Sequence, residues 1–287
     1  MVNDYLSIGA VERDSGIARD TLRVWERRYG FPEPLRNPRG ERLYPVEQLR
    51  KLQKIRRLMD QGHRPGKIVA LSDADLLQLE NTLPGIDEPA EHVQQLVTLL
   101  QDTDGSGLED AFDTIYKEHG MEYFIVHTAA PMLRYIGELW ARNQLDIYEE
   151  HFLSVMLTRF LNNKISILQR YAGRPRALLA TLPGERHTLG LLMVASMLSS
   201  HGISVINLGA EVPLDQLVSA TDRYDADIVG ITFSGAYPYE NIRGNLTELR
   251  DYIEQDVDIW VGGDGVTRLR KLPAGVTRLT SLDKLPV

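Results

Sequence analysis

The 287-residue sequence contains no cysteine. This absence excludes disulfide frameworks, thiolate zinc sites and cysteine nucleophiles together. Long apolar segments are missing too, because the longest run, Leu189–Leu198, is far shorter than the roughly 20 residues that a membrane span needs. The first residues, Met1 to Tyr5, have neither the basic tip nor the apolar run of a signal peptide. We therefore expect a soluble cytoplasmic protein with no membrane partner.

Aromatic residues make up only 7% of the chain, but 43% hydrophobic and 25% charged residues are ordinary for globular proteins. This composition argues against disorder and against a fibrous repeat. A chain of this length buries about three quarters of its unfolded surface and commonly forms two or three domains.

The formal net charge of −8, taken alone, argues against a nucleic-acid partner. The charge is unevenly distributed, however. Residues 1–67 hold 15 basic and 9 acidic side chains, a balance of +6, whereas the remainder holds 17 basic and 31 acidic side chains, a balance of −14. A basic segment joined to an acidic one favours a DNA-binding head. A basic face that is merely solvated would give the same counts.

The basic segment has the pattern of two short helices followed by a hairpin and a longer helix. A helix from Ile8 stops at Gly16, and a second runs from Arg19 to Tyr29, with Leu22, Val24 and Trp25 as candidates for its packed side. Three prolines and a glycine in residues 31–44 exclude a long helix there and favour a basic hairpin, or wing. Apolar residues at helical spacing predict a further helix over about 46–60.

Three motifs in this order give a specific resemblance. They are Ser7-Ile-Gly-Ala-Val, Thr21-Leu-Arg-Val-Trp-Glu-Arg-Arg-Tyr-Gly and Arg42-Leu-Tyr. Together they resemble the DNA-binding head of MerR-family transcription regulators, which implies a winged helix-turn-helix domain over residues 1–72.

Positions on the helix-turn-helix suggest which side chains meet DNA. Early residues of the second helix, Arg19, Thr21 and Arg23, lie where recognition helices contact base edges. Side chains of the wing are better suited to phosphates, which position the protein without specifying sequence. These wing residues are Arg36, Arg39, Arg42 and Tyr44.

The rest of the chain divides by its texture. Residues 73–89 are polar and contain Pro84, Gly85 and Pro89, which predicts a linker or a loosely attached helix. Helical periodicity over 90–172 predicts a bundle of about four helices. Over 173–287, short apolar runs alternate with helical stretches, which predicts a Rossmann-like parallel sheet covered on both faces. We therefore expect a multidomain protein.

Polar and glycine-rich loops follow three of the predicted strands. Ligands of such sheets bind beyond the carboxyl ends of the strands. A loop imidazole there, His187, can coordinate a metal, and Glu185, two residues earlier, can fix its tautomer. No second histidine lies nearby in the sequence, so a zinc cage is excluded. A single protein ligand makes sense if a macrocycle supplies the others.

This arrangement resembles the cobalamin-binding fold. Glu185-x-His187-x-x-Gly190 matches the family's acidic-x-His-x-x-Gly signature, and Gly262-Gly263 matches its glycine pair. The resemblance implies that His187 is the lower axial ligand of cobalt and that the glycine pair lies beside the nucleotide tail. Thr232-Phe-Ser234 replaces the family's Ser-x-Leu element but keeps a hydroxyl at each end. We expect adenosylcobalamin, or another cobalamin, as the cofactor.

The predicted bundle carries a second motif. Trp140, nine residues, then Glu150-His151 is similar to the cap of light-sensing, cobalamin-dependent MerR-like repressors of carotenoid genes, in which the three residues cover the adenosyl group. Ala141 stands where those relatives have a histidine that captures cobalt after the upper ligand is lost. A bis-histidine photoproduct by that route is excluded, whereas His151 or His127 could substitute.

Together these features predict a cobalamin-dependent, light-responsive regulator, a repressor and not an enzyme, with operator DNA and further copies of itself, as a dimer or tetramer, as partners. Two alternatives remain open. In one, the cobalamin-like module is cofactor-free and serves oligomerisation or protein binding. In the other, the chain is a corrinoid-carrying enzyme subunit, which would leave the basic winged head unexplained.

Overall fold

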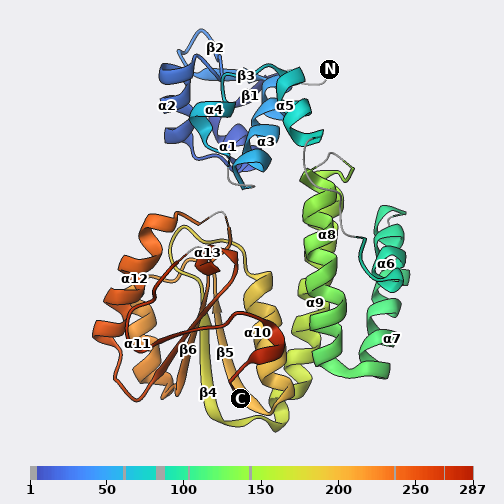
Figure 1. Cartoon of the computed structure of the whole chain (residues 1–287), viewed down its shortest axis with the longest axis vertical. Helices are drawn as coiled ribbons and strands as arrows, with labels where there is room; N and C mark the ends of the chain where they lie inside the picture. Colours follow the sequence, from blue (N-terminus) through green and yellow to red (C-terminus); the bar gives the residue numbers. More distant parts are fainter. Residues whose placement is uncertain are drawn as a thin grey trace. The chain divides into compact units, whose positions relative to one another are not determined.

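The computed structural model describes residues 5–60, 63–81, 88–102, 104–141, 144–235, 237–267 and 269–286. The chain forms two compact units (Figure 1). The first comprises residues 1–87 together with 137–144, and the second comprises 88–136 together with 145–287. Within the described ranges, no helix combines the length and the apolar character needed to cross a membrane.

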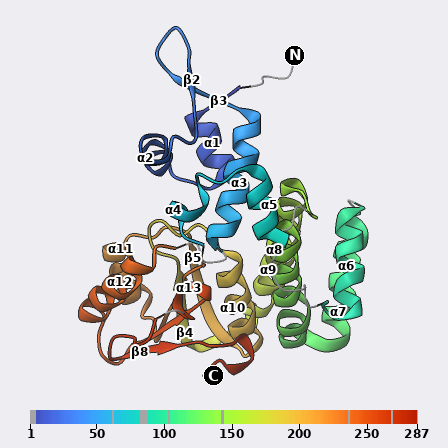
Figure 2. The same ribbon diagram turned by 45° about the horizontal axis from the view of Figure 1, so that its top comes forward.

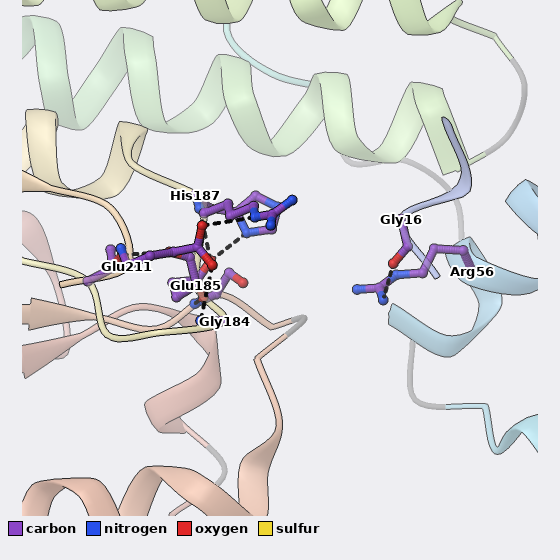
Figure 3. A network of polar contacts seen from close by, with 9 residues as sticks. Gly16, Arg56, Gly184, Glu185, His187 and Glu211 are labelled. Atoms are coloured by element: carbon purple, nitrogen blue, oxygen red, sulfur yellow. Dashed lines mark hydrogen bonds and ion pairs between the residues drawn. The ribbon is translucent and has the colours of Figure 1, made fainter. Parts of the chain in front are cut away.

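The head of the first unit is a winged helix-turn-helix, as the sequence predicted. Gly16 and Gly30 adopt the left-handed conformation that ends the first two helices, and the Ser7 hydroxyl caps the first by accepting the Ala10 N–H. The Arg56 guanidinium donates to the Gly16 carbonyl at 3.3 Å, which ties the first turn to the third long helix (Figure 3). The elements are β1 Tyr5–Ser7, α1 Ile8–Ser15, α2 Arg19–Tyr29, β2 Leu35–Arg36, β3 Arg42–Pro45, α3 Val46–Asp60, α4 Pro65–Ile68 and α5 Asp73–Asn81.

Two predicted side-chain positions in the head are wrong. Tyr44 was expected on the DNA-facing surface, but it is fully buried among core residues such as Val11 and Leu22. It lies on β3, the central strand of the sheet β1-β3-β2, and its side chain points to the helices. Burial raises the pKa of Tyr44. Val24, expected in the core, is 42% exposed.

Part of the predicted linker belongs to the head. Helix α5 occupies residues 73–81, and its Leu76 is fully buried in the head core with Ile55 and Leu58. The polar composition of α5 hides this packing, which involves Leu76 and the partly buried Leu79. Pro84 and Gly85 lie outside the described residues.

Residues 88–168 form the predicted helical bundle. Gly120, with φ 83° and ψ 178°, interrupts α7, and a π-helical turn follows it. The bundle core contains Phe112, Phe124 and Phe160, whose rings contact one another. The elements are α6 Glu91–Gln101, α7 Gly105–Tyr123, η1 Phe124–Ala129, α8 Ala130–Ala141 and α9 Ile147–Leu168, followed by η2 Gln169–Tyr171. The predicted break after α8 begins at Arg142 and Asn143, which lie outside the described residues.

Residues 173–286 form a five-stranded parallel sheet in the order β5-β4-β6-β7-β8. Figure 2 shows α10, α11 and α12 beside this sheet. Leu178 and Leu179 of β4 face opposite ways. Leu178 packs with α11 and α12, and Leu179 packs with α10, which in turn contacts α9 of the bundle. The elements are β4 Gly173–Ala180, α10 Leu189–Ser200, β5 Ile203–Gly209, α11 Leu214–Tyr224, β6 Ile228–Thr232, α12 Tyr239–Tyr252, β7 Asp258–Gly262, α13 Asp264–Thr267, β8 Val276–Arg278 and η3 Leu282–Lys284.

The doubly covered sheet confirms the predicted Rossmann-like fold. The sequence missed the short α13 and the edge strand β8. Loops after β4, β6 and β7 emerge at the same edge, because the carboxyl ends of parallel strands lie together. The three loop motifs singled out in the sequence therefore meet at one edge of the sheet.

Candidate cobalamin site

The loop between β4 and α10 presents His187 on a buried carboxylate (Figure 3). Glu185 is 1% exposed, whereas the His187 side chain is 68% exposed. One Glu185 oxygen lies 2.6 Å from His187 Nδ1 and accepts the His187 backbone N–H at 2.9 Å. The other oxygen accepts the backbone N–H of Ser234, after β6, at 2.7 Å. The carboxylate thus joins the ends of two strands beneath an exposed imidazole.

The hydrogen bonds keep Glu185 ionised. Its burial opposes ionisation, but donors from the His187 ring and backbone and from Ser234 outweigh this effect and lower the pKa of Glu185 to about 2. An ionised carboxylate can only accept. His187 Nδ1 is therefore the protonated ring nitrogen, and Nε2 is the nitrogen with a lone pair for a metal.

Residues outside the sequence motif brace this loop. The Thr181 hydroxyl donates to the Glu185 carbonyl at 2.6 Å and accepts the Glu211 N–H at 3.0 Å. Glu211 Oε2 accepts from Arg186 Nε at 3.0 Å. On the other side, the Tyr237 hydroxyl donates to the Pro183 carbonyl at 3.3 Å. Sequence reasoning missed these contacts, because their partners lie far away along the chain.

A cavity of about 430 Å³ opens beside His187. Its walls are mostly apolar, and they come from α8, the sheet, α10 and the segment after β8. Its lining includes Arg134, Leu179, His187, Gly190, Leu191, Val194, Thr232, Ser234, Trp260, Gly262, Gly263 and Leu279–Leu282. Such a volume suits a nucleoside-sized group.

Two observations on the cavity wall favour a ligand with polar atoms that approaches the backbone closely. The Thr232 hydroxyl is buried without a hydrogen-bond partner among the described residues, which is costly unless a ligand supplies one. At Gly190 a Cβ would make only an ordinary contact, 3.8 Å from Thr232, so the packing of the chain does not itself require glycine there. Gly263 differs from Gly190. Its φ is +92° and a Cβ there would collide with the Phe233 carbonyl, so the chain itself requires glycine at this position.

The structure brings together most of the predicted cofactor residues, but not all. His187, Gly190, Thr232, Ser234 and the glycine pair 262–263 line the cavity, with Glu185 buried beneath the imidazole. Sequence reasoning missed Trp260 and Arg134 as lining residues. Trp260 stands in a buried strand, where an indole is ordinarily a core residue.

The predicted cap residues are not among those that line this cavity. Trp140, on α8, belongs to the first unit, whereas Glu150 and His151, on α9, belong to the second. His151 Nδ1 lies 2.6 Å from a Glu150 oxygen, and the His151 side chain is 72% exposed. The side chain of Ala141 lies outside the described residues.

In the head, most of the predicted DNA contacts carry intramolecular partners. Arg19 pairs with Glu12 and Arg23 with Asp20, both on exposed helix surfaces. The Arg42 guanidinium contacts Glu26 of α2 at 2.8 Å, which braces the wing against the second helix. The other predicted contacts form no ion pair within the described head. Arg36 donates to the Gly40 carbonyl at 3.0 Å. Arg39 is exposed, and Thr21 is half-buried on α2.

Comparison with protein families finds matches in the head, in the helical bundle and in the sheet domain. Residues 6–75 match the MerR HTH family regulatory proteins, and two B12 binding domain families match residues 93–165 and 175–275. The chain carries a MerR-type DNA-binding domain followed by two B12-binding domains. The two B12-binding matches fall on the helical bundle and on the sheet that holds His187.

Relatives agree with this assignment. The regulator is 29% identical to the HTH-type transcriptional repressor CarH of Myxococcus xanthus over 87% of this chain and 85% of the relative. It is also 29% identical to the repressor CarA of the same organism, over 85% and 81%. The solved monomethylamine corrinoid protein of Methanosarcina barkeri shares the fold, with a TM-score of 0.53 and 13% identity over 66% of this chain and 92% of that one.

Proposed function

We propose that this regulator is a light-responsive transcriptional repressor whose oligomerisation and operator binding are controlled by adenosylcobalamin. The observation that carries the proposal is His187, held by buried Glu185 at the edge of a cavity with an unpartnered hydroxyl, in a chain that also carries a DNA-binding head. The names of the relatives CarH and CarA, both repressors, support the direction of regulation.

The chain's own residues divide the work of holding the cofactor. His187 Nε2 would ligate cobalt, while Glu185 keeps the proton on Nδ1 and fixes the ring. Gly190, Thr232, Ser234 and the pair Gly262-Gly263 would surround the nucleotide tail. When bound, adenosylcobalamin supplies a cobalt–carbon bond that light can break.

Trp140, Glu150 and His151 would cover the upper group of the cofactor. The support is the Trp-x9-Glu-His spacing and the close Glu150–His151 pair on α9. Because residue 141 is alanine, no imidazole follows Trp140 to replace the lost upper ligand. We propose that His187 would hold the cofactor after illumination, and that His127 and His151 are the histidines that could substitute for the missing one.

On DNA, Arg19, Thr21 and Arg23 would contact base edges, and Arg36, Arg39 and Arg42 would contact phosphates. Tyr44 is withdrawn from this set because it is buried. A symmetric homo-oligomer, a dimer or tetramer, would present its heads to repeated half-sites. Such a regulator works on DNA in the cytoplasm and performs no catalysis of its own.

We propose a domain division that follows the structure. The head covers 1–81, because α5 packs in its core, where the sequence placed the boundary at 72. A linker leads to the bundle from about 90 to 172, and the cobalamin domain covers 173–287. The bundle and the cobalamin domain lie largely in one compact unit.

The test is a spectrum and a size measurement on the full chain, purified in the dark. With adenosylcobalamin, we expect visible corrin bands on the protein, a larger particle in size-exclusion chromatography and tighter binding to an operator fragment. Green light reverses the size and DNA effects, and His187→Ala weakens all three in the dark.

Different failures have different meanings. Cofactor binding that leaves size and DNA affinity unchanged excludes the sensor role, and operator binding without any corrin bands would indicate a cofactor-free module. Failure to bind DNA together with methyl transfer in a reconstituted assay would make the chain a corrinoid enzyme subunit.

A further inference from the structure

Arg134 introduces a positive charge into the cavity wall from the helical bundle. It lies on α8, in the part of that helix that belongs to the same unit as the sheet. The cavity lining that surrounds it is otherwise mostly apolar. In the described part of the chain, Arg134 makes no ion pair, unlike Arg159 of the same bundle, which pairs with Glu109.

Among the described residues that line the cavity, Arg134 is the only permanent cation. His187 belongs to the cobalt side, and Asp264 is an acid in the first turn of α13. The hydroxyl side chains of the wall are neutral: Thr232, Ser234, Thr267, Thr280 and Ser281. A ligand that fills this cavity and carries one negative charge would find its complement in Arg134.

We infer that Arg134 binds the phosphodiester of the cofactor's nucleotide tail, so that the bundle recognises the tail as well as the upper face of the corrin. This inference rests on the proposed cobalamin function and deepens it. The tail has one permanent anion, its phosphodiester, between the aminopropanol link and the ribose. A guanidinium suits such a phosphate because its planar donors can engage two oxygens together.

The inference explains why α8 of the bundle contributes a wall to a cavity that is otherwise formed by the sheet, α10 and the segment after β8. Two apolar residues of that helix also line the cavity: Ala130, one turn before Arg134, and the adjacent Leu133. A corrinoid that lacks the phosphate would lose this link to the bundle while it keeps the His187 ligand. The bundle would then distinguish complete from incomplete corrinoids.

The experiment compares three probes that differ in one group. Cobinamide lacks the phosphate, cobinamide phosphate adds it, and cobalamin carries the whole tail. Spectral titration of the full chain gives a dissociation constant for each. For Arg134→Gln we expect about tenfold weaker binding of cobinamide phosphate and of cobalamin, with cobinamide unchanged. Arg134→Lys, which keeps the charge, should recover part of the loss.

Arg223→Gln is the matched control, because Arg223 is exposed on α11 and does not line the cavity. Far-UV circular dichroism verifies that Arg134→Gln and Arg223→Gln leave the fold intact. The inference is overturned if Arg134→Gln binds cobinamide phosphate as tightly as the wild type does. It is also overturned if the substitution weakens the binding of cobinamide as much as that of cobinamide phosphate. If the wild type binds none of the probes, the proposed cofactor function fails instead.

Discussion

A single unpartnered polar atom in the cavity wall can lower the stability of the cofactor-free chain and also contribute to ligand binding. The Thr232 hydroxyl is the clearest example, since it is buried and has no partner within the described residues. A buried hydroxyl of this kind costs about 1–3 kcal/mol of unfolding free energy. The cost is tolerated where a bound molecule supplies the hydrogen bond.

Thr232→Val should therefore separate stability from binding. We expect the cofactor-free variant to melt at the same temperature as wild type or higher, by up to about 1 kcal/mol of unfolding free energy. Cobalamin affinity should fall several-fold. Thermal unfolding and spectral titration measure the two effects, and Thr247→Val on exposed α12 is the control. A lower melting temperature with unchanged affinity would make Thr232 a purely structural residue.

Glycines 190 and 263 serve the cavity in different ways, and substitution separates them. Gly263→Ala should destabilise the module by about 3 kcal/mol, because a Cβ meets the Phe233 carbonyl and the backbone is left-handed. Gly190→Ala meets no close atom and adds helix propensity, so the variant should fold normally yet bind cobalamin more weakly. Melting temperatures and titrations compare them. The reverse ranking of stabilities would contradict this account.

Elements of the bundle are held together by charged contacts that depend on pH. Asp113 of α7 contacts Lys164 of α9 at 2.5 Å and Lys117 at 3.1 Å. Hydrogen bonds from Lys164 and then Lys117 lower the pKa of Asp113 below its ordinary value. A depressed native pKa stabilises the folded state above the ordinary carboxyl value, and the stabilisation is lost as the pH falls through the native pKa.

Asp113→Asn should consequently lower stability near neutral pH by about 0.5–1 kcal/mol, since the pair is partly exposed. The difference from wild type should narrow as the pH falls below about 4. Thermal unfolding of both proteins between pH 7 and pH 3.5 measures it. Asp110→Asn, one turn away, serves as the control, and a gap that widens in acid would disprove the assignment.

The sequence was informative where a residue's role is local. Apolar runs predicted β4, β6 and β7, because a strand buried on both faces needs a continuous apolar segment. The sequence did not predict β8, because Val276–Arg278 is a short edge strand with only one apolar residue. Tyr44 was misplaced because a polar hydroxyl in a basic hairpin resembles a surface group, whereas the alternation of side chains along β3 places it on the face that packs against the helices.

The candidate site was predictable in part for a similar reason. Glu185 and His187 are two residues apart, so their hydrogen bond could be foreseen from spacing. Arg134 and Thr181 reach the site through tertiary packing between distant segments, which no local pattern reveals. The same holds for the braces from Glu211 and Tyr237.

At the scale of the whole molecule, charge is divided between a basic head and an acidic remainder. Phosphate contacts release counterions, so DNA affinity should fall steeply as salt rises. Arg39→Gln should weaken binding to all sequences alike and reduce the slope of log affinity against log salt by about 0.9. Arg23→Gln should instead alter preference at one base pair by about 1–3 kcal/mol.

Fluorescence anisotropy on operator and scrambled duplexes at several salt concentrations measures both effects. Arg270→Gln, an exposed substitution outside the head, is expected to change neither. An Arg39 variant that alters sequence preference, or an Arg23 variant that alters only the salt slope, would reverse the proposed roles of wing and helix.

The Thr181 hydroxyl, which joins the end of β4 to the start of the loop after β5, has a consequence for signalling. Together with Glu211, Arg186 and Tyr237, it restrains the histidine loop from both sides. Because the loop is restrained on both sides, we expect it to keep its position with and without the upper ligand of the proposed cofactor. Under the proposed function, a displacement that reports illumination to the operator would therefore originate in the helical bundle.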